Sequence, residues 1–249
     1  MNNSVFRFDV PQNEPVLEYA PGSPERARLE AELERQAATE IEIPLVIGGE
    51  EVRTGRTRPV VMPTEHGHVL ARAHLAGEAE VRRAAAAAVA AHETWSTLSW
   101  IERASILLKA AELLSKKHRM LINASTMLGQ GKNAHQAEID AACETIDYLR
   151  YNVYFASQIY AEQPRSTVEQ LNRMEYRPLE GFVFTVSPFN FTAIASNLNL
   201  AVALMGNTTV WKPASTALLS NYHLMRLFME AGLPPGVVNF VPGEGAVVG

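Results

Sequence analysis

The chain has little cysteine and no long apolar run, and each shortage excludes a class of protein. Among 249 residues there is one cysteine, Cys143, so no disulfide forms within the chain, which fits a reducing compartment. No apolar run approaches the roughly 20 residues of a membrane-spanning helix. The first nine residues lack a signal peptide's apolar core and carry too few arginines for a transit peptide. We therefore expect a cytoplasmic protein without a membrane partner.

Positive charge and metal-binding side chains are also scarce. The chain carries 22 lysines and arginines against 27 acidic residues, a formal net charge of −5, so no nucleic-acid partner is expected. His66, His68 and His74 lie close in sequence, but no fourth ligand with suitable spacing accompanies them. We interpret them as solvated surface residues and expect no metal site.

The first 160 residues are expected to form an arm, short strands and a layer of helices. Prolines between residues 6 and 24 predict an extended arm. Gly48 and Gly49 within an alternating stretch predict a hairpin over residues 44–53, and a further strand is expected over 69–76. Ser99 and Glu102 have the spacing of a capping box at the start of a helix. Further helices are predicted over residues 26–39, 80–95, 117–128 and 134–154.

From residue 181 the chain alternates between strand and helix patterns. Strands are predicted over residues 181–186, 208–212 and 237–241, with a helical face over 191–205 and a second helix that Ser215 caps. Short connections between them indicate right-handed crossovers and a parallel sheet, so the predicted fold class is α/β. Such sheets bind ligands at the carboxyl ends of their strands. We therefore expect a site where the strands end, at residues 187–190, 212–215 and 243–249.

Each of these three loops offers a candidate residue with a plainer alternative. Asn190 precedes a helix, so its amide either caps that helix or donates to a developing oxyanion. Lys212 either reaches the hydroxyls of a ribose or extends past the sheet edge into solvent. Gly245 and Gly249 belong to a stretch that resembles a dinucleotide fingerprint but has one residue too many and follows the third strand. A structural turn and a phosphate-binding turn both remain open there.

The single thiol is a tempting nucleophile, but its context is apolar. Cys143 shares a predicted helix face with Ile139 and Ile146, and no basic residue in the pattern is placed to lower its pKa. We interpret it as a core residue.

Taken together, these segments resemble the aldehyde dehydrogenase superfamily. The resemblance rests on GFVFTVSPFNFT at 181–192, GNTTVWKPA at 206–214 and GLPPGVVNFVPG at 232–243. Within the superfamily, SPFNFTA at 187–193, GQGKNAHQAEIDAACE at 129–144 and NEPVLEYAPG at 13–22 are similar to the Δ1-pyrroline-5-carboxylate dehydrogenase branch. The resemblance implies the amino-terminal part of the aldehyde dehydrogenase fold, with a helical layer and an incomplete parallel, Rossmann-like βαβαβ sheet.

The resemblance also implies an activity, a cofactor and roles for particular residues. The activity is the NAD-dependent oxidation of L-glutamate γ-semialdehyde, formed from 1-pyrroline-5-carboxylate, to L-glutamate in proline breakdown. Asn190 would be the catalytic oxyanion donor, and Glu138 a substrate-side residue, with an ordinary helix-surface glutamate as the alternative. The residues expected to contact NAD are Val186, Ser187, Pro188, Phe189, Lys212, Ser215, Gly245 and Gly249.

The family's nucleophilic cysteine and general-base glutamate would lie beyond residue 249. We therefore expect an amino-terminal fragment that is inactive alone. Its expected parts are an arm with short strands and helices over residues 1–160, an oligomerisation strand segment over 161–180, and the first half of the NAD-binding domain over 181–249. A homo-oligomer is expected for the full-length protein. The alternatives are another aldehyde dehydrogenase, such as one acting on succinate semialdehyde, and a non-catalytic module that binds a nucleotide or a partner.

Overall fold

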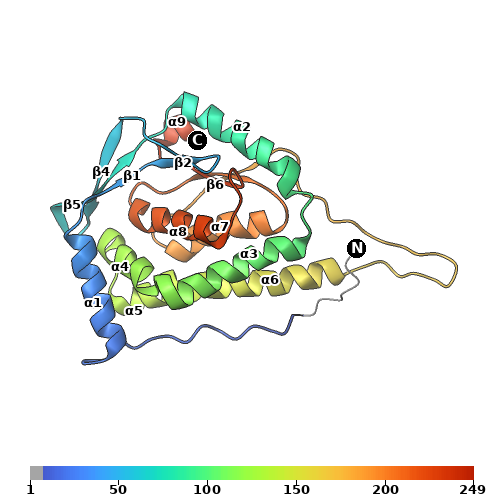
Figure 1. The fold of residues 1–249 in the computed structure, drawn as a ribbon, viewed down its shortest axis with the longest axis horizontal. Helices are drawn as coiled ribbons and strands as arrows, with labels where there is room; N and C mark the ends of the chain where they lie inside the picture. The colour runs from blue at the N-terminus through green and yellow to red at the C-terminus, as the bar shows by residue number, and fades with distance from the viewer. Residues whose placement is uncertain (1–7) are drawn as a thin grey trace.

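A five-stranded sheet, with helices on both faces, forms the centre of the molecule, which a computed structural model describes over residues 8–249 (Figure 1). The order of its strands is β3 (Glu50–Val52), β2 (Leu45–Ile47), β8 (Val238–Phe240), β7 (Thr209–Lys212) and β6 (Val183–Val186). Strands β6, β7 and β8 are parallel, with Val186 opposite Lys212 and Trp211 opposite Phe240. The predicted βαβαβ order and the parallel pairing are confirmed.

The hairpin β2–β3 has a place in this sheet that the sequence pattern did not predict. Its strands pair around the turn at Gly48 and Gly49, as expected. In addition, β2 pairs antiparallel with β8 through Val46 and Phe240. The predicted boundary at residue 181 therefore separates strands that belong to one sheet.

A second, smaller sheet lies beside the first. Its central strand β5 (Glu65–His74) pairs with β1 (Ile41–Ile43) on one side and β4 (Thr57–Met62) on the other. The strand predicted over residues 69–76 is the second half of β5. His74 is buried, where its ring hydrogen-bonds with Glu42 and accepts from the amide of Gly55. The interpretation of His74 as a solvated surface residue is therefore wrong.

Helices cover the central sheet in two layers. On one face lies α2 (Glu78–Trp95), and on the other lie α7 (Thr192–Leu204) and α8 (Leu218–Ala231), with a further helical layer beyond them (Figure 1). That layer contains α3 (Trp100–Leu113), η1 (Leu114–His118), α4 (Arg119–Gln130), α5 (Ala134–Ala137), η2 (Glu138–Glu144) and α6 (Thr145–Ala161). The predicted capping box of Ser99 and Glu102 is present at α3.

Three details of the helical layer differ from the sequence prediction. The chain winds as π-helix in η1 and η2, which no helical repeat in the sequence indicated. Helix α4 ends at Gln130, two residues later than predicted, and its C-cap residue is Gly131, whose φ of 67° suits glycine. Helix α1 (Pro24–Ala37) begins two residues earlier than predicted because Ser23 caps it.

Residues 162–182, between α6 and β6, contain no strand, although a strand segment was expected over residues 161–180. They form an extended ribbon that projects from the body of the molecule (Figure 1). Its two sides are joined mostly by hydrogen bonds that involve side chains, such as that from the Met174 amide to the Gln163 side chain at 2.8 Å. The arm before Ser23 is extended, as predicted, over its described residues; Phe6 lies outside them.

Within residues 8–249, no helix is long and apolar enough to cross a bilayer, and no cluster of three or more histidine, cysteine or acidic side chains could hold a metal ion.

Candidate functional site

The candidate site begins where strand β6 ends, at Ser187. Its amide donates to the carbonyl of Lys212 at 3.3 Å, which continues the pairing with β7 by one residue. Its hydroxyl accepts a hydrogen bond from the indole of Trp211 at 3.0 Å, and the residue is 4% exposed. Ser187 is thus fixed to the neighbouring strand, and the turn that follows starts from a rigid point.

The turn itself is open to solvent. Phe189 is 68% exposed and Asn190 is also exposed. Helix α7 begins at Thr192 with Phe191 as its N-cap residue, so the alternative in which Asn190 caps the helix is wrong. Among residues 8–249, no group hydrogen-bonds with the carboxamide of Asn190. It remains free to bind a group at the sheet edge.

A carboxylate from another helix caps α7 in place of Asn190. The two oxygens of Asp140 accept from the amides of Thr192 and Ala193, each at 3.0 Å. Lys132 pairs with the same carboxylate at 2.6 Å, and Asp140 is 3% exposed. A negative charge at a helix N-terminus interacts favourably with the free amides and the helix dipole. The start of α7 is therefore fixed without any help from the turn.

The first residue of α7 is held from two further helices. The hydroxyl of Thr192 donates to Ser220 of α8 at 3.1 Å, accepts from Gln130 at 2.7 Å, and hydrogen-bonds with Thr126 of α4 at 2.9 Å. These groups are buried or partly buried, where hydrogen-bonded networks are rigid. The turn is thus anchored at both ends, with Asn190 between the anchors.

An acidic groove lies near the start of α7. Glu144, in the turn of helix after Asp140, is partly buried; burial and the charges of Asp140 and Asp147 raise its pKa, while Lys132 lowers it. It lines a groove of about 490 Å³, together with Asn13, Asp147, Tyr148, Tyr151, Asn152, Phe155 and Asn197. The groove thus offers carboxylate and amide groups to a small polar molecule.

Lys212 and Ser215 follow the next strand, as predicted. The ammonium of Lys212 donates only to the carbonyl of Pro213, at 3.3 Å, and no carboxylate among residues 8–249 pairs with it. Ser215 lies in a turn and is partly exposed, but Ala217 is the N-cap residue of α8, so the predicted cap by Ser215 is wrong. Both side chains are available at the carboxyl edge of the sheet.

The third loop leads from β8 into the short helix α9 (Gly245–Val248). Gly245 and Gly249 are exposed, and a Cβ atom added at Gly245 would meet nothing within 4 Å. Val241 donates to the carbonyl of Trp211 at 2.8 Å, which keeps this loop at the same sheet edge as Lys212. The three loops therefore converge, as the strand order predicted.

Glu138 does not face this edge. It is 0% exposed and accepts hydrogen bonds from Arg119, Tyr19, Asn123 and the amide of Leu17. Burial alone would raise its pKa, but the hydrogen bonds from Arg119 and Tyr19 hold the pKa below its ordinary value. The helix-surface alternative is wrong, and the expected substrate contact does not fit this geometry. Its carboxylate instead fixes the extended arm to the helices.

Cys143 is buried, which confirms its interpretation as a core residue. Burial and the nearby charge of Glu138 raise the pKa of the thiol to about 12. A basic residue is close after all, since Arg119 approaches the sulfur at 3.5 Å, but its lowering effect on the pKa is smaller. A thiol with this pKa is protonated at neutral pH and is a poor nucleophile.

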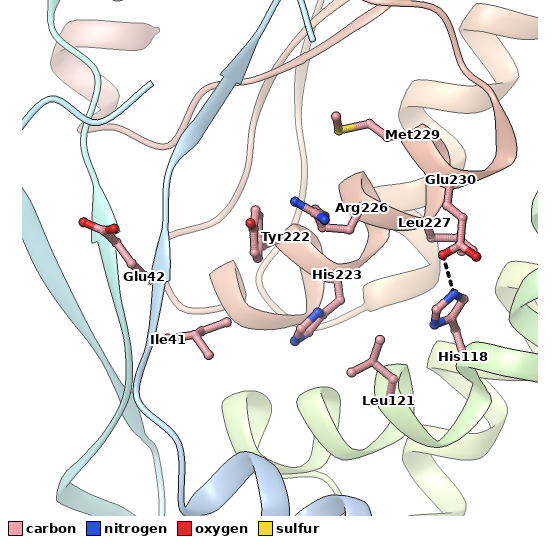
Figure 2. Close-up of a pocket in the computed structure, with 10 residues that line it drawn as sticks. All are labelled: Ile41, Glu42, His118, Leu121, Tyr222, His223, Arg226, Leu227, Met229 and Glu230. Atoms are coloured by element: carbon pink, nitrogen blue, oxygen red, sulfur yellow. Dashed lines mark hydrogen bonds and ion pairs between the residues drawn. The ribbon is translucent and has the colours of Figure 1, made fainter. Parts of the chain in front are cut away.

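A cavity of about 660 Å³ lies elsewhere, between α8, α4 and β1 (Figure 2). None of the predicted site residues lines it. Its charged side chains are largely paired, His118 with Glu230 at 2.7 Å and Arg226 with Glu51 of β3 at 2.9 Å. The view shows His223 directed into the space between Ile41 and Leu121. This cavity is separate from the sheet edge and adds nothing to the candidate site.

The sequence predicted that the turn, its asparagine and Lys212 lie at one edge of the sheet, but it did not predict Asp140 and Lys132 beside them. Both stand in the segment 129–144, and Asp140 lies in the π-helical turn η2. A regular helical repeat does not give the direction of a side chain in such a turn. The only signal was an acidic residue within an otherwise apolar helix face.

Comparisons with known proteins agree with this geometry. Residues 51–249 match the model of the aldehyde dehydrogenase family. A Δ1-pyrroline-5-carboxylate dehydrogenase from Agaricus bisporus is 49% identical over 98% of this chain and 45% of its own length. The NAD-bound structure of the enzyme of that name from Mycobacterium tuberculosis superposes with a TM-score of 0.97 at 48% identity, over 99% of this chain and 46% of that one.

A more distant structure has the same fold. The 1-pyrroline-5-carboxylate dehydrogenase from Thermus with bound NAD superposes with a TM-score of 0.88 at 32% identity, over 98% of this chain and 47% of that one. The chain thus spans less than half the length of these relatives. The matches confirm the predicted fold and resemblance, and the chain belongs to the aldehyde dehydrogenase family.

Proposed function

We propose that this chain provides the cofactor side of an NAD-dependent dehydrogenase that oxidises L-glutamate γ-semialdehyde, formed from 1-pyrroline-5-carboxylate, to L-glutamate. The observation that carries the proposal is the turn at residues 187–191, anchored at both ends, with the unbonded carboxamide of Asn190 at the carboxyl edge of a parallel sheet. Relatives 46–49% identical to this chain bear the name Δ1-pyrroline-5-carboxylate dehydrogenase, which supports the choice of substrate.

The three loops at the sheet edge fit a dinucleotide. Lys212 presents an ammonium group that pairs with no carboxylate among the described residues. This group is therefore available to donate hydrogen bonds to the hydroxyls of a ribose. The space around Gly245 lets a phosphate approach the backbone. Exposed apolar side chains at Val186 and Phe189 offer surface to the flat rings of the cofactor. Bound NAD would accept the hydride. The groove that we propose is completed by Ser187, Pro188, Ser215 and Gly249.

Asn190 would act on the aldehyde. A side-chain amide that donates to the carbonyl oxygen stabilises the negative charge that develops as a nucleophile adds to the carbonyl carbon. The anchored ends of the turn preorganise this donor, so little reorganisation is needed during the reaction. The nucleophile is not Cys143, because its thiol is buried and protonated. We therefore propose that residues 1–249 alone are inactive.

On the substrate side, we propose Glu144 in place of Glu138. Its carboxylate is partly exposed in the acidic groove near the start of α7, and L-glutamate γ-semialdehyde carries an ammonium group that such a carboxylate binds.

The projecting ribbon at residues 162–182 offers a surface to a second copy of the chain, and we propose a homo-oligomer for the full-length protein. A cytoplasmic location remains part of the proposal, although several relatives are named as mitochondrial.

The test is a substrate panel on the complete gene product, with NADH formation as the readout. We expect the semialdehyde to be oxidised with a higher kcat/KM than propionaldehyde or succinate semialdehyde. Asn190→Ala should lower kcat by about 100-fold to 1,000-fold, the usual cost of removing one oxyanion donor. A preference for succinate semialdehyde would overturn the assigned substrate, and full activity of Asn190→Ala would overturn the assigned role.

A further inference from the structure

Asn190 lies one residue before Phe191, the N-cap residue of α7, and its side chain takes no part in capping that helix. Asparagine is among the strongest N-cap residues, because its side-chain oxygen accepts from the free amides of the first helical turn. In α7 two of the free amides of the first turn, those of Thr192 and Ala193, are taken by Asp140. Were these two amides free, the side-chain oxygen of Asn190 could accept from them, and the carboxamide would then turn away from the sheet edge.

Asp140 can reach α7 because it lies in the π-helical turn η2 (Glu138–Glu144) and is fixed there. Lys132 holds one carboxylate oxygen at 2.6 Å, and the pair is mostly buried, with Asp140 3% exposed. The same ammonium lies 4.4 Å from the centre of the Phe191 ring, the residue between Asn190 and the helix. One ion pair thus contacts both the start of α7 and the last residue of the turn.

We propose that Asp140 is a positioning residue for Asn190: it caps α7 from outside and so keeps the Asn190 carboxamide available to the carbonyl oxygen of the substrate. Lys132 orients Asp140 and packs on Phe191, which sets the direction of the turn. This inference rests on the proposed function, since it assigns Asp140 a role through the catalytic residue Asn190. Asp140 itself does not touch substrate or cofactor in this arrangement.

The test is a double-mutant cycle in the complete gene product, with kcat/KM for the aldehyde and the dissociation constant of NAD as readouts. Asp140→Ala should lower kcat/KM by about 10-fold to 100-fold in the wild-type background. In the Asn190→Ala background the same change should have little further effect, because the group through which Asp140 acts is gone. Asp140→Asn, which keeps one acceptor, should recover part of the loss. NAD should bind all variants with similar affinity.

The matched control is Thr145→Val, a nearly isosteric change on the same stretch of helix. Thr145 is fully buried and its hydroxyl has no hydrogen-bond partner among the described residues, so its loss should leave kcat/KM unchanged. Equal losses from Asp140→Ala in both backgrounds would overturn the inference, because a merely structural residue acts regardless of Asn190. Full activity of a folded Asp140→Ala protein would overturn it as well.

The two proposals fail in different ways. If the wild-type protein does not oxidise the aldehydes, the proposed function fails. If the wild type is active and Asn190→Ala is not, while Asp140→Ala matches the wild type, only the positioning role fails. Should Asp140→Ala not fold, the cycle is run with Asp140→Asn, for which additive losses are the contradicting result.

Discussion

Glu138 and Arg119 form a buried ion pair where the extended arm meets the helices. Arg119 donates to Glu138 at 3.1 Å and also pairs with Glu14 of the arm at 2.6 Å. Removing one member of such a pair leaves the other charged and buried, which costs about 3–5 kcal/mol. Glu138→Gln should therefore lower the free energy of unfolding by that amount, as measured by urea denaturation.

The control for Glu138→Gln is Glu30→Gln, which breaks the exposed pair of Arg26 and Glu30 on one helix face. Exposed pairs of this kind are worth about 0.3–0.5 kcal/mol. Equal effects of the two changes would show that Glu138 is not a buried anchor of the arm.

The thiol of Cys143 gives a second prediction at the residue scale. Because burial and the charge of Glu138 raise its pKa to about 12, almost none of it is thiolate at pH 8. In the folded protein it should react with a disulfide reagent far more slowly than in urea, and Cys143→Ala should leave any dehydrogenase activity unchanged. Rapid labelling of the folded protein would contradict the raised pKa.

At this scale the sequence predicted the position of residues at the ends of recognisable elements, such as Asn190 just before α7 and Lys212 at the end of β7. It was wrong where a role depends on what another element contributes. Ser215 has the chemistry of a cap, but the helix starts three residues after it, at Leu218, with Ala217 as the N-cap residue. Glu138 has the chemistry of a substrate contact, but Tyr19 and Leu17 of the arm, more than 100 residues away in sequence, occupy its carboxylate.

At the scale of the elements, alanine substitutions of the two glycines that follow helices α7 and α8 distinguish the cost of backbone strain from the cost of steric crowding. Gly206 and Gly232 have φ values of 90° and 99°, so alanine at either site costs about 1 kcal/mol or more. A Cβ at Gly206 would also lie 2.7 Å from Cγ of Pro178, whereas at Gly232 it would meet nothing within 4 Å. Gly206→Ala should therefore be the more destabilising change, by about 1–3 kcal/mol.

Thermal unfolding of the two alanine variants measures this difference, with Gly55→Ala as a further control. Gly55 also has a positive φ, of 76°, and free space around its α-carbon. Equal losses at Gly206 and Gly232 would show that Pro178 moves aside and that the contact carries no energy.

The elements with strong local signals were predicted and those without were not. The capping box at Ser99 and the glycine turn at residues 48–49 specify their own backbone, and both are present. The π-helical turn η2 has no such signal, because one extra residue per turn is set by packing against α4 and α7. The direction of Asp140, and with it the cap of α7, follows from that packing.

For the whole molecule, the least predictable feature was the pairing of distant segments. Strand β2 joins the sheet through Val46 and Phe240, which are separated by almost the whole chain. The amide of Gly48 donates to the Asn239 side chain at 2.8 Å and strengthens this junction. The continuous apolar run of β2 shows that the strand is buried on both faces, but it does not identify the neighbouring strand.

The free energy of unfolding should fall in acid, because two groups, His223 and Glu138, both have a lowered pKa in the folded chain. Burial and the nearby charge of Arg35 lower the pKa of His223 to about 4 from an ordinary 6.5. The unfolded chain then binds one more proton than the folded chain between pH 6.5 and 4, so stability falls as pH drops through this window. The pKa of Glu138 is lowered too, so its contribution is present above its ordinary 4.5 and is lost below it.

His223 can be separated from the carboxylates by the pH at which each acts. Urea denaturation at pH 7.5 and 5 should show a loss of at most about 1.4 kcal/mol per pH unit from this histidine, since one proton is involved. His223→Gln cannot bind that proton, so its stability should change less over the interval, while Glu138→Gln should keep the wild-type slope there. An unchanged slope in His223→Gln would mean that the imidazole is protonated in the folded state, with the charge of Glu32 compensating that of Arg35.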